Sequence, residues 1–414
     1  MSAVRDSGTV AAALRTSLVT ALWFVFLTFP VMVVKVNPIE KTVQWRWWNM
    51  ALVGAGAFLL SLAGRYVLRK KEANEGREGR RDAVAAARRL MEERNLFRPA
   101  AGLLVIFALV FPFLFSSYQT SIMTTALMYV VLGLGLNIVV GLAGLLDLGY
   151  VAFYAVGAYT YALLNYYYGV GFWAALPAGA ALGALFGILL GFPVLRLRGD
   201  YLAIVTLGFG EIIRLVLENW NDFSLGPSGV ANIPRPSLPG VDLSLQASNT
   251  YLYFLMLGLV AITVFVVGRL QDSRIGRAWI ALREDEIACQ AMGVDKTRTK
   301  LTAFALGATW AGMMGVVFAA KNTFVNPASF TFLESAMILS IVVLGGMGSI
   351  VGVMAGAFIL ILLPEYLRAF SDLRMLLFGA IMVVMMVFRP EGIIRAARRT
   401  YLFRETEDHS HGER

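Results

Sequence analysis

Two residue types on which many protein functions depend are scarce in this sequence of 414 residues. It has one cysteine, Cys289, so no disulfide can form within the chain. Its two histidines, His409 and His411, lie in a polar C-terminal tail. The sequence therefore excludes a disulfide scaffold, a metal site built from histidine and cysteine, and a nucleophile activated by a histidine base. We expect no metal site.

A nucleotide-binding loop is also missing. The pattern Gly-x-x-x-x-Gly-Lys followed by Ser or Thr, whose backbone holds nucleotide phosphates, does not occur. We therefore expect that this chain is not an enzyme and binds no cofactor. If its function consumes ATP, another protein must hydrolyse it.

Long apolar runs are what the sequence has in abundance. Hydrophobic residues make up 58% of the chain, in runs about as long as the ~20 residues that cross a bilayer core. This pattern predicts an all-α, polytopic membrane protein with 10 to 12 transmembrane helices. The predicted spans are residues 17–36, 48–68, 100–116, 121–142, 149–167, 173–195, 201–219, 250–269, 301–321, 333–348, 350–365 and 373–389. The weakest predictions are the span 201–219, which carries Glu211 and Arg214, and the pair 333–348 and 350–365. The Gly345–Gly348 junction of this pair is also typical of a break between two half-helices.

Basic residues give the expected orientation. The net charge is +9, and the Lys and Arg residues gather in segments 65–98 and 269–300 and in the tail after residue 389. Basic loops stay in the cytoplasm, so we expect both termini on the cytoplasmic side of the membrane. The same clustering beside apolar spans argues against a nucleic-acid partner and for the lipid bilayer.

A change of composition near residue 98 predicts three regions. Residues 1–98 form an N-terminal extension with two spans and a basic cytoplasmic segment, residues 99–392 a compact multi-span domain, and residues 393–414 a polar cytoplasmic tail. The Pro- and Gly-rich segment 222–249 is the one long external loop, and it suits an ordered cap or docking surface, or else a plain connector.

Residues 276–293, here called the 276–293 loop, form a charged insert between two apolar spans. In a short helix, small and apolar residues share one side and acidic residues mostly face water. Gly293 fits a helix C-terminal turn with positive φ, and Asp295 fits the N-cap of the next helix. The loop either lies on the membrane surface or docks into a partner. The apolar side holds Ala281, Ile287, Ala288, Ala291 and Met292, and the polar side Glu284, Asp285, Glu286 and Gln290.

Glycines at four-residue spacing predict close helix packing. One row is Gly179, Gly183, Gly187 and Gly191, and a second is Gly348, Gly352 and Gly356.

The run 133–149 contains many glycines, among them Gly141 and Gly144, and two strongly polar residues, Asn137 and Asp147. It is either a broken helix that lines a pathway or a tight glycine-rich turn. Glu211, three residues before Arg214, is either half of an ion pair or a residue of the pathway.

Several blocks in the same order resemble the branched-chain amino acid permease family of ABC importers. The resemblance covers about residues 100 to 392, and the N-terminal extension is similar to that of the larger of the two permeases in the leucine, isoleucine and valine system. The general importer loop has Glu-Ala-Ala and a glycine six residues after the Glu. Here Ile287 replaces the first Ala and Gly293 lies seven after Glu286, as in the branched-chain and ribose branch. The blocks are Gly141–Gly149, Gly157–Tyr159, Leu195–Ala203, Thr206–Ile212, 276–293, Ile341–Ser349 and Arg389–Gly392.

The resemblance implies a bacterial plasma (inner) membrane location and a set of partners. These are a second permease, two ATPase subunits that carry ATP and Mg²⁺, and a periplasmic amino acid binding protein. The loop residues that would couple to the ATPases are Gly276, Arg277, Glu284, Glu286, Ala288 and Gly293. Three alternatives stay open: a permease for urea or short amides, an ion-coupled secondary transporter that uses Asp147, Glu211 or Glu334, and a membrane scaffold that transports nothing.

Overall fold

The computed structural model describes residues 34–37, 42–45, 105–194, 199–236 and 244–366, and the single positions or short runs 197, 379, 383 and 392–394. The chain divides into two compact units, Met1–Ile106 and Phe107–Arg414. Within the first, β1 (Val34–Asn37) pairs antiparallel with β2 (Thr42–Trp45), with Val34 opposite Trp45. The predicted span 17–36 is therefore wrong at its end, where residues 34–36 are strand. The spans 48–68 and 373–389 lie outside the described residues, apart from positions 379 and 383.

The second unit is helical. The helix Val105–Leu114 leads into it and corresponds to the predicted span 100–116. The elements that follow are α5 (Ser117–Leu136), the π-helix η1 (Asn137–Leu142), α6 (Val151–Tyr168), α7 (Phe172–Val194), α8 (Asp200–Asn219), α9 (Asn221–Ser224), η2 (Gly226–Ser228), β3 (Val230–Ala231), α10 (Leu245–Gln271), α11 (Arg274–Glu284), α12 (Glu286–Ala291), α13 (Lys296–Asn322), β4 (Phe324–Val325), η3 (Pro327–Ser329), α14 (Phe332–Gly345) and α15 (Ile350–Tyr366).

Five of the described helical segments are long and apolar enough to cross a membrane. They are Ser117–Leu142, Phe172–Val194, Leu245–Gln271, Lys296–Asn322 and Pro327–Gly345. The predicted spans 149–167 and 201–219 are helices too, α6 and α8, and whether they cross stays a prediction. The all-α, multi-pass class is confirmed, with two very short antiparallel ladders added.

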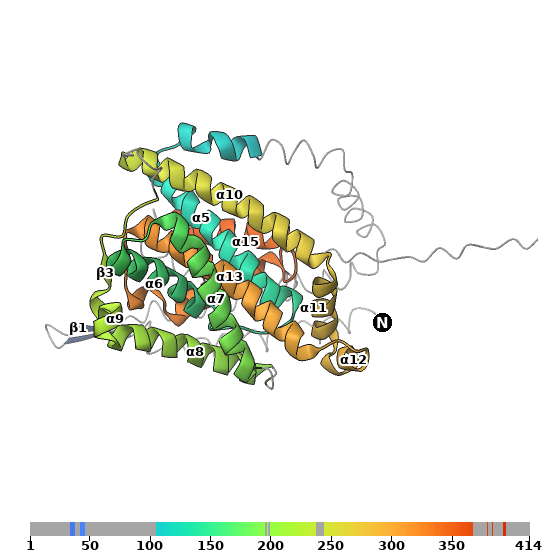
Figure 1. Ribbon diagram of the computed structural model, residues 1–414. Coiled ribbons are helices and arrows are strands. Elements are labelled where there is room, and N and C mark those ends of the chain that lie inside the picture. Colours follow the sequence, from blue (N-terminus) through green and yellow to red (C-terminus); the bar gives the residue numbers. More distant parts are fainter. Residues whose placement is uncertain are drawn as a thin grey trace, which may run out of the picture. The chain divides into compact units, whose positions relative to one another are not determined.

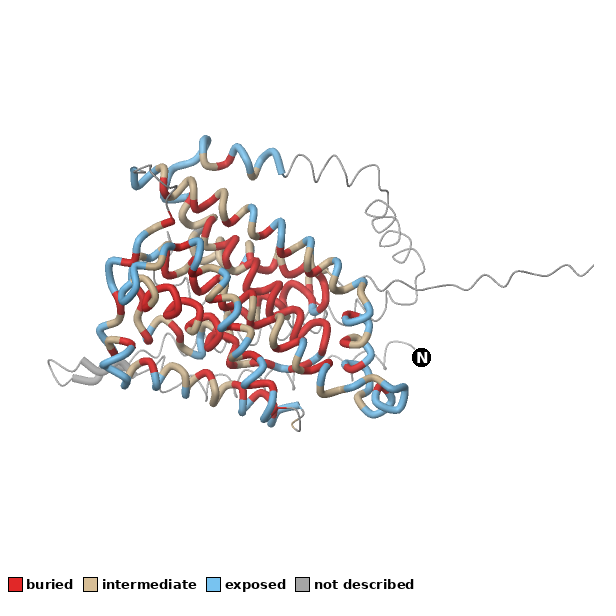
Figure 2. Tube along the Cα trace, in the orientation of Figure 1, coloured by how far each residue is buried: buried red, intermediate tan, exposed pale blue. Residues whose placement is uncertain are grey.

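Helices α5, α6 and α13 form the centre of this unit (Figure 1). The segment from α5 through η1 and the helix α13 are mostly buried, whereas α7 and α10 expose much of their surface, as Figure 2 shows. Because lipid is as apolar as a leucine side chain, burial alone does not hold such helices together, and close van der Waals contact does.

The glycine row of α7 faces α13. A Cβ atom on Gly179 would lie 2.4 Å from Val316 Cγ2, and one on Gly183 would lie 2.5 Å from the carbonyl oxygen of Ala308. Gly187 and Gly191 meet Ala308 and Leu301 at 2.7 Å in the same way. This row therefore lets α7 approach α13 more closely than any larger residue would.

In the second glycine row, Gly348 differs from Gly352 and Gly356. Cβ atoms on Gly352 and Gly356 would lie 2.3 Å and 2.6 Å from carbonyl oxygens of α14, so α15 packs closely there. Gly348 precedes α15 and has φ +85°, so it belongs to the turn between α14 and α15. The prediction that it packs within a helix is wrong, and the predicted break at Gly345–Gly348 is confirmed.

The segment predicted to be an external loop is ordered where it is described. After α8 the chain forms α9, η2 and β3, and β3 pairs with β4 beyond α13, with Val230 opposite Val325. Residues 237–243 lie outside the described residues.

Candidate functional site: the 276–293 loop and the broken helix beside it

The 276–293 loop contains two short helices. Helix α11 begins after Ser273, whose side chain accepts a hydrogen bond from Gly276 N, and it ends at Glu284 because Asp285 is extended, with φ −156°. The Asp285 carboxylate then caps α12 by accepting hydrogen bonds from Ile287 N (2.7 Å) and Ala288 N (3.0 Å). The prediction of a single short helix is therefore wrong, since the capping preference of Asp285 divides it.

Helix α11 is fixed to the membrane helices beside it. Trp279 is fully buried, and its indole Nε1 donates a hydrogen bond to the carbonyl of Thr299 in α13, 3.0 Å away. A Cβ atom on Gly276 would lie 2.2 Å from the carbonyl oxygen of Leu270 in α10, so only glycine allows this approach. Sequence reasoning missed Trp279, although an aromatic residue in a charged segment was the available signal.

Glu286 does not face water as predicted. Its carboxylate forms an ion pair with Lys300 in the first turns of α13, and only 2% of the Lys300 side chain is exposed. The ammonium group of a buried lysine needs a charged partner, and Glu286 is that partner. Glu286 therefore holds α12 against α13.

Apolar side chains of α12 point outward instead. Ile287 is 70% exposed and Met292 is 83% exposed, and Ala288 and Ala291 between them are exposed as well. We call these four residues the α12 tip. Gly293 has φ +83°, and the Asp295 carboxylate caps α13, accepting from Thr297 N at 2.9 Å, so both predictions about this turn are confirmed. An exposed apolar patch on a firmly anchored helix is typical of a protein interface.

The remaining candidate residues of the loop lie on its surface. Arg277 is exposed, and its guanidinium donates to the carbonyl of Asp272, 3.0 Å away. Glu284, the last residue of α11, is exposed too.

The run 137–149, here called the broken helix, contains both a change within a helix and a glycine turn, and its role in lining a pathway stays a prediction. Helix α5 changes to a π-helix at Asn137, the helix ends at Leu142, and Gly144 has φ +71°. Within this segment the buried Asn137 Oδ1 accepts a hydrogen bond from Gly348 N at 2.8 Å. π-helical turns inside long helices frequently mark functional positions.

Polar atoms without partners are concentrated here. Among the side chains that the structure describes, three buried polar atoms have no hydrogen-bond partner, and two of them are Asn137 Nδ2 and Asp147 Oδ2. Asp147 Oδ1 accepts from Gly149 N at 2.9 Å. Burial raises the pKa of the Asp147 carboxyl, which lies between the helices η1 and α6, to about 7. Buried polar atoms of this kind need water or a ligand to pair with.

The broken helix contacts the 276–293 loop directly. Arg283 of α11 donates a hydrogen bond from Nη1 to the carbonyl of Gly141. Leu148 N donates to Thr206 Oγ1 in α8 at 3.0 Å, and Val151 N donates to Ser335 Oγ in α14 at 3.0 Å. The structure thus brings Gly141 and Gly144 next to the loop, a contact that the sequence did not indicate, whereas Asn137 contacts the turn between α14 and α15.

The other carboxylates have partners. Arg214 bonds Glu211 (2.8 Å) and Glu218 (2.7 Å) along α8, so the predicted ion pair is present and is extended by Glu218. Glu334 accepts a hydrogen bond from the Tyr129 hydroxyl at 2.6 Å. No group of three or more His, Cys, Asp or Glu residues that could hold a metal occurs among the described residues.

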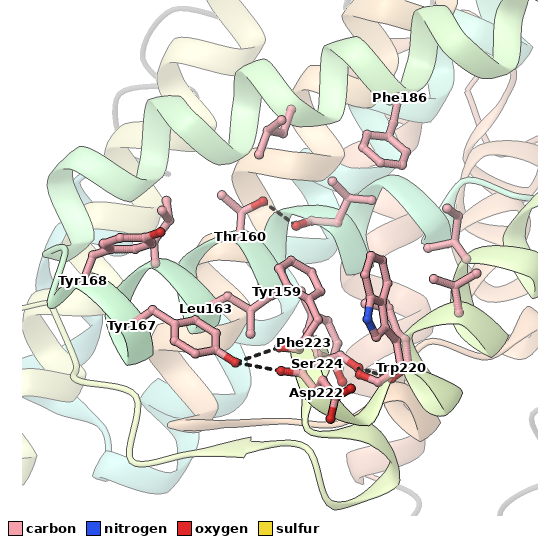
Figure 3. A pocket seen from close by; sticks show the side chains of 16 residues that line it. Tyr159, Thr160, Leu163, Tyr167, Tyr168, Phe186, Trp220, Asp222, Phe223 and Ser224 are labelled. Atoms are coloured by element: carbon pink, nitrogen blue, oxygen red, sulfur yellow. Dashed lines mark hydrogen bonds between the residues drawn. The ribbon is translucent and has the colours of Figure 1, made fainter.

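A separate apolar pocket of about 690 Å³ lies between α6, α7, α8 and α9, and no sequence pattern indicated it (Figure 3). Aliphatic and aromatic side chains make up most of its lining, and the aromatic ones include Tyr159, Phe186, Trp220 and Phe223. The Tyr167 hydroxyl closes one edge by donating to the carbonyl of Asp222 at 3.1 Å. None of the predicted pathway residues lines it.

Comparisons with known proteins agree with this architecture. Residues 118–386 match a family model described as the branched-chain amino acid transport system permease component. The high-affinity branched-chain amino acid transport permease proteins LivM of Salmonella typhimurium and Escherichia coli are each 50% identical over 315 residues, which are 71% of this chain and 74% of each relative. The corresponding LivH protein of Escherichia coli is 24% identical over 288 residues, 64% of this chain and 91% of LivH. No solved structure matches the chain.

Proposed function

We propose, from the fact that this chain belongs to the permease family of the branched-chain amino acid transport system, that it is a permease subunit of an importer for leucine, isoleucine and valine. The names of the LivM relatives support this substrate class. A second, LivH-type permease would complete the translocation pathway, since LivH proteins are recognisably similar to this chain. The permease domain would span residues 99–392, after an N-terminal extension and before a cytoplasmic tail.

The observation that carries the coupling part of this proposal is the α12 tip. Exposed Ile287 and Met292 are held on a short helix that Trp279 and the Glu286–Lys300 pair fasten to the membrane helices. Such a tip suits insertion into a groove of a cytoplasmic ATPase, and the rigid support suits it to transmit force. ATP and Mg²⁺ would be bound on the two ATPase subunits, because this chain has no phosphate-binding loop.

The orientation follows from charge. The loop contains Arg277 and Arg283 and is flanked by Arg274, Lys296 and Arg298. It therefore lies on the cytoplasmic side of a bacterial inner membrane, with both termini on the same side. A periplasmic binding protein would deliver the amino acid to the opposite face, where the segment after α8 forms an ordered surface.

A purification in mild detergent tests the proposal. We expect two ATPase subunits and a second permease to co-purify with this chain, and a binding protein loaded with leucine to stimulate ATP hydrolysis. Stimulation by binding proteins loaded with urea or a short amide, and not with leucine, would assign the other substrate class. Uptake driven by an ion gradient in vesicles that contain this chain alone would instead identify a secondary transporter and contradict the proposal.

A further inference from the structure

Three elements meet at Gly141. The Gly141 carbonyl accepts a hydrogen bond from Arg283 of α11. A Cβ atom at this position would lie 1.9 Å from Asn137 Oδ1 in the same π-helix and 2.6 Å from Gly348 N in the turn between α14 and α15. Only glycine therefore lets the loop, the broken helix and this turn come together.

The rest of the Arg283 side chain also lies against the broken helix. A Cβ atom on Gly144 would lie 2.6 Å from Arg283 Cγ, and the positive φ of Gly144 turns the chain at this contact. Gly141 lies in the last turn of a helix that ends at Leu142, where carbonyl groups lack helical partners. A guanidinium group is a strong donor to such a carbonyl, because it carries a full charge.

Arg283 is also well placed to move with the docking surface. It lies one helical turn after the buried Trp279, and Asp285 two residues later starts the helix that carries the α12 tip. From Gly141 the contact continues through Asn137 to Gly348, whose carbonyl accepts from Gln271 Nε2 at the end of α10 (3.4 Å). These hydrogen bonds and the close contact between Gly141 and Asn137 connect the loop to η1, to the turn between α14 and α15, and to the end of α10.

We propose that Arg283 is a positioning residue that carries movement of the 276–293 loop into the broken helix at Gly141. The inference rests on the proposed function, because it takes the α12 tip as the site on which an ATPase acts. In this arrangement α11 moves as a rigid helix, and the π-helical turn is the element that changes conformation. Arg283 contacts neither the transported amino acid nor ATP.

The test uses the complete transporter in proteoliposomes and measures amino acid uptake and ATP hydrolysis on the same sample. Arg283→Gln removes the charged donor, and Arg283→Lys keeps the charge on a single donor nitrogen. Arg274→Gln removes an exposed arginine from the same helix as a control. We expect Arg283→Gln to lower the amino acid transported per ATP about tenfold while hydrolysis stays within about twofold. Arg283→Lys should recover part of this ratio, and Arg274→Gln should not change it.

Three results would overturn the inference. An unchanged ratio in Arg283→Gln, with uptake and hydrolysis both at the level of the unsubstituted complex, would show that the hydrogen bond transmits nothing. Loss of the assembled complex in both Arg283 variants, or an equal fall in uptake and hydrolysis, would show that Arg283 only stabilises the fold. The unsubstituted complex is measured first, and its failure to bind an ATPase or to drive uptake with ATP would contradict the proposed function itself.

Discussion

Individual residues of the 276–293 loop divide into those that anchor it and those that remain available to a partner. Glu286 belongs to the first group, although its place in the family motif suggests direct contact with an ATPase. Its carboxylate neutralises Lys300, whose side chain is almost wholly buried. Ile287, the next residue, has its side chain mostly in solvent. Within the motif, Glu286 therefore anchors α12, and the neighbouring Ile287 is exposed and can contact a partner.

Removing the Glu286 carboxylate should destabilise the loop. Glu286→Gln removes the carboxylate that is paired with the buried Lys300 ammonium, and breaking a buried ion pair by removing one partner costs ~3–5 kcal/mol. We expect a lower midpoint of thermal unfolding in detergent and faster amide hydrogen exchange across residues 286–300.

The double variant Glu286→Gln, Lys300→Met should regain part of that loss, because the buried ammonium group is then removed as well. The exposed Glu284→Gln serves as the control and should shift the midpoint by much less. Equal effects of Glu286→Gln and Glu284→Gln would mean that the ion pair does not anchor α12.

Glycine residues, which have no side chain, determine how closely neighbouring helices pack. The α7 glycines face α13, and Gly157 of α6 is just as closely opposed, since a Cβ atom there would lie 1.9 Å from the carbonyl oxygen of Gly312. The four-residue spacing within α7 was visible in the sequence. The pairing of Gly157 with Gly312 was not, because it joins single glycines on helices far apart in the chain.

A branched side chain at the α7–α13 contact should separate the two helices. Gly183→Val places atoms within 2.5 Å of the Ala308 carbonyl, so one helix must move. We expect a large fall in the amount of folded protein and in its thermal midpoint, measured by fluorescence-detected size exclusion after heating.

Gly258→Val is the matched control, since a Cβ atom at Gly258 of α10 meets no atom within 4 Å. It should behave like the unsubstituted chain. If both variants were equally stable, close packing of α7 on α13 would not be a requirement of the fold.

At the scale of the whole molecule, the sequence predicted most of the architecture because each apolar run is a local signal. The runs located the long helices, and glycine and aspartate marked the turn at Gly293 and the cap at Asp295. Contacts between distant segments had no such signal. The Arg283–Gly141 hydrogen bond, the Glu286–Lys300 pair and the aromatic pocket all join residues that no short sequence pattern connects. The orientation rests on charge alone and can be measured.

Cysteine accessibility gives that measurement. The native Cys289 is buried, so it should react slowly with a thiol reagent that cannot cross the membrane. In intact cells, Tyr168→Cys should be labelled from outside, whereas Met292→Cys should be labelled only after the inner membrane is permeabilised. Both positions are accessible, since 79% of Tyr168 and 83% of Met292 are exposed. The opposite pattern would reverse the orientation and place the α12 tip away from any cytoplasmic ATPase.

Site-specific photo-crosslinking can detect the proposed docking of the α12 tip onto an ATPase. A photoreactive amino acid is placed at Ile287 or at Met292, and at the exposed Leu245 as a control. Leu245 begins the 27-residue helix α10, about 40 Å from the end that leads into the loop. We predict crosslinks to an ATPase subunit from positions 287 and 292 and none from 245. If an assembled complex that hydrolyses ATP forms no crosslink from either tip position, the α12 tip does not dock onto an ATPase.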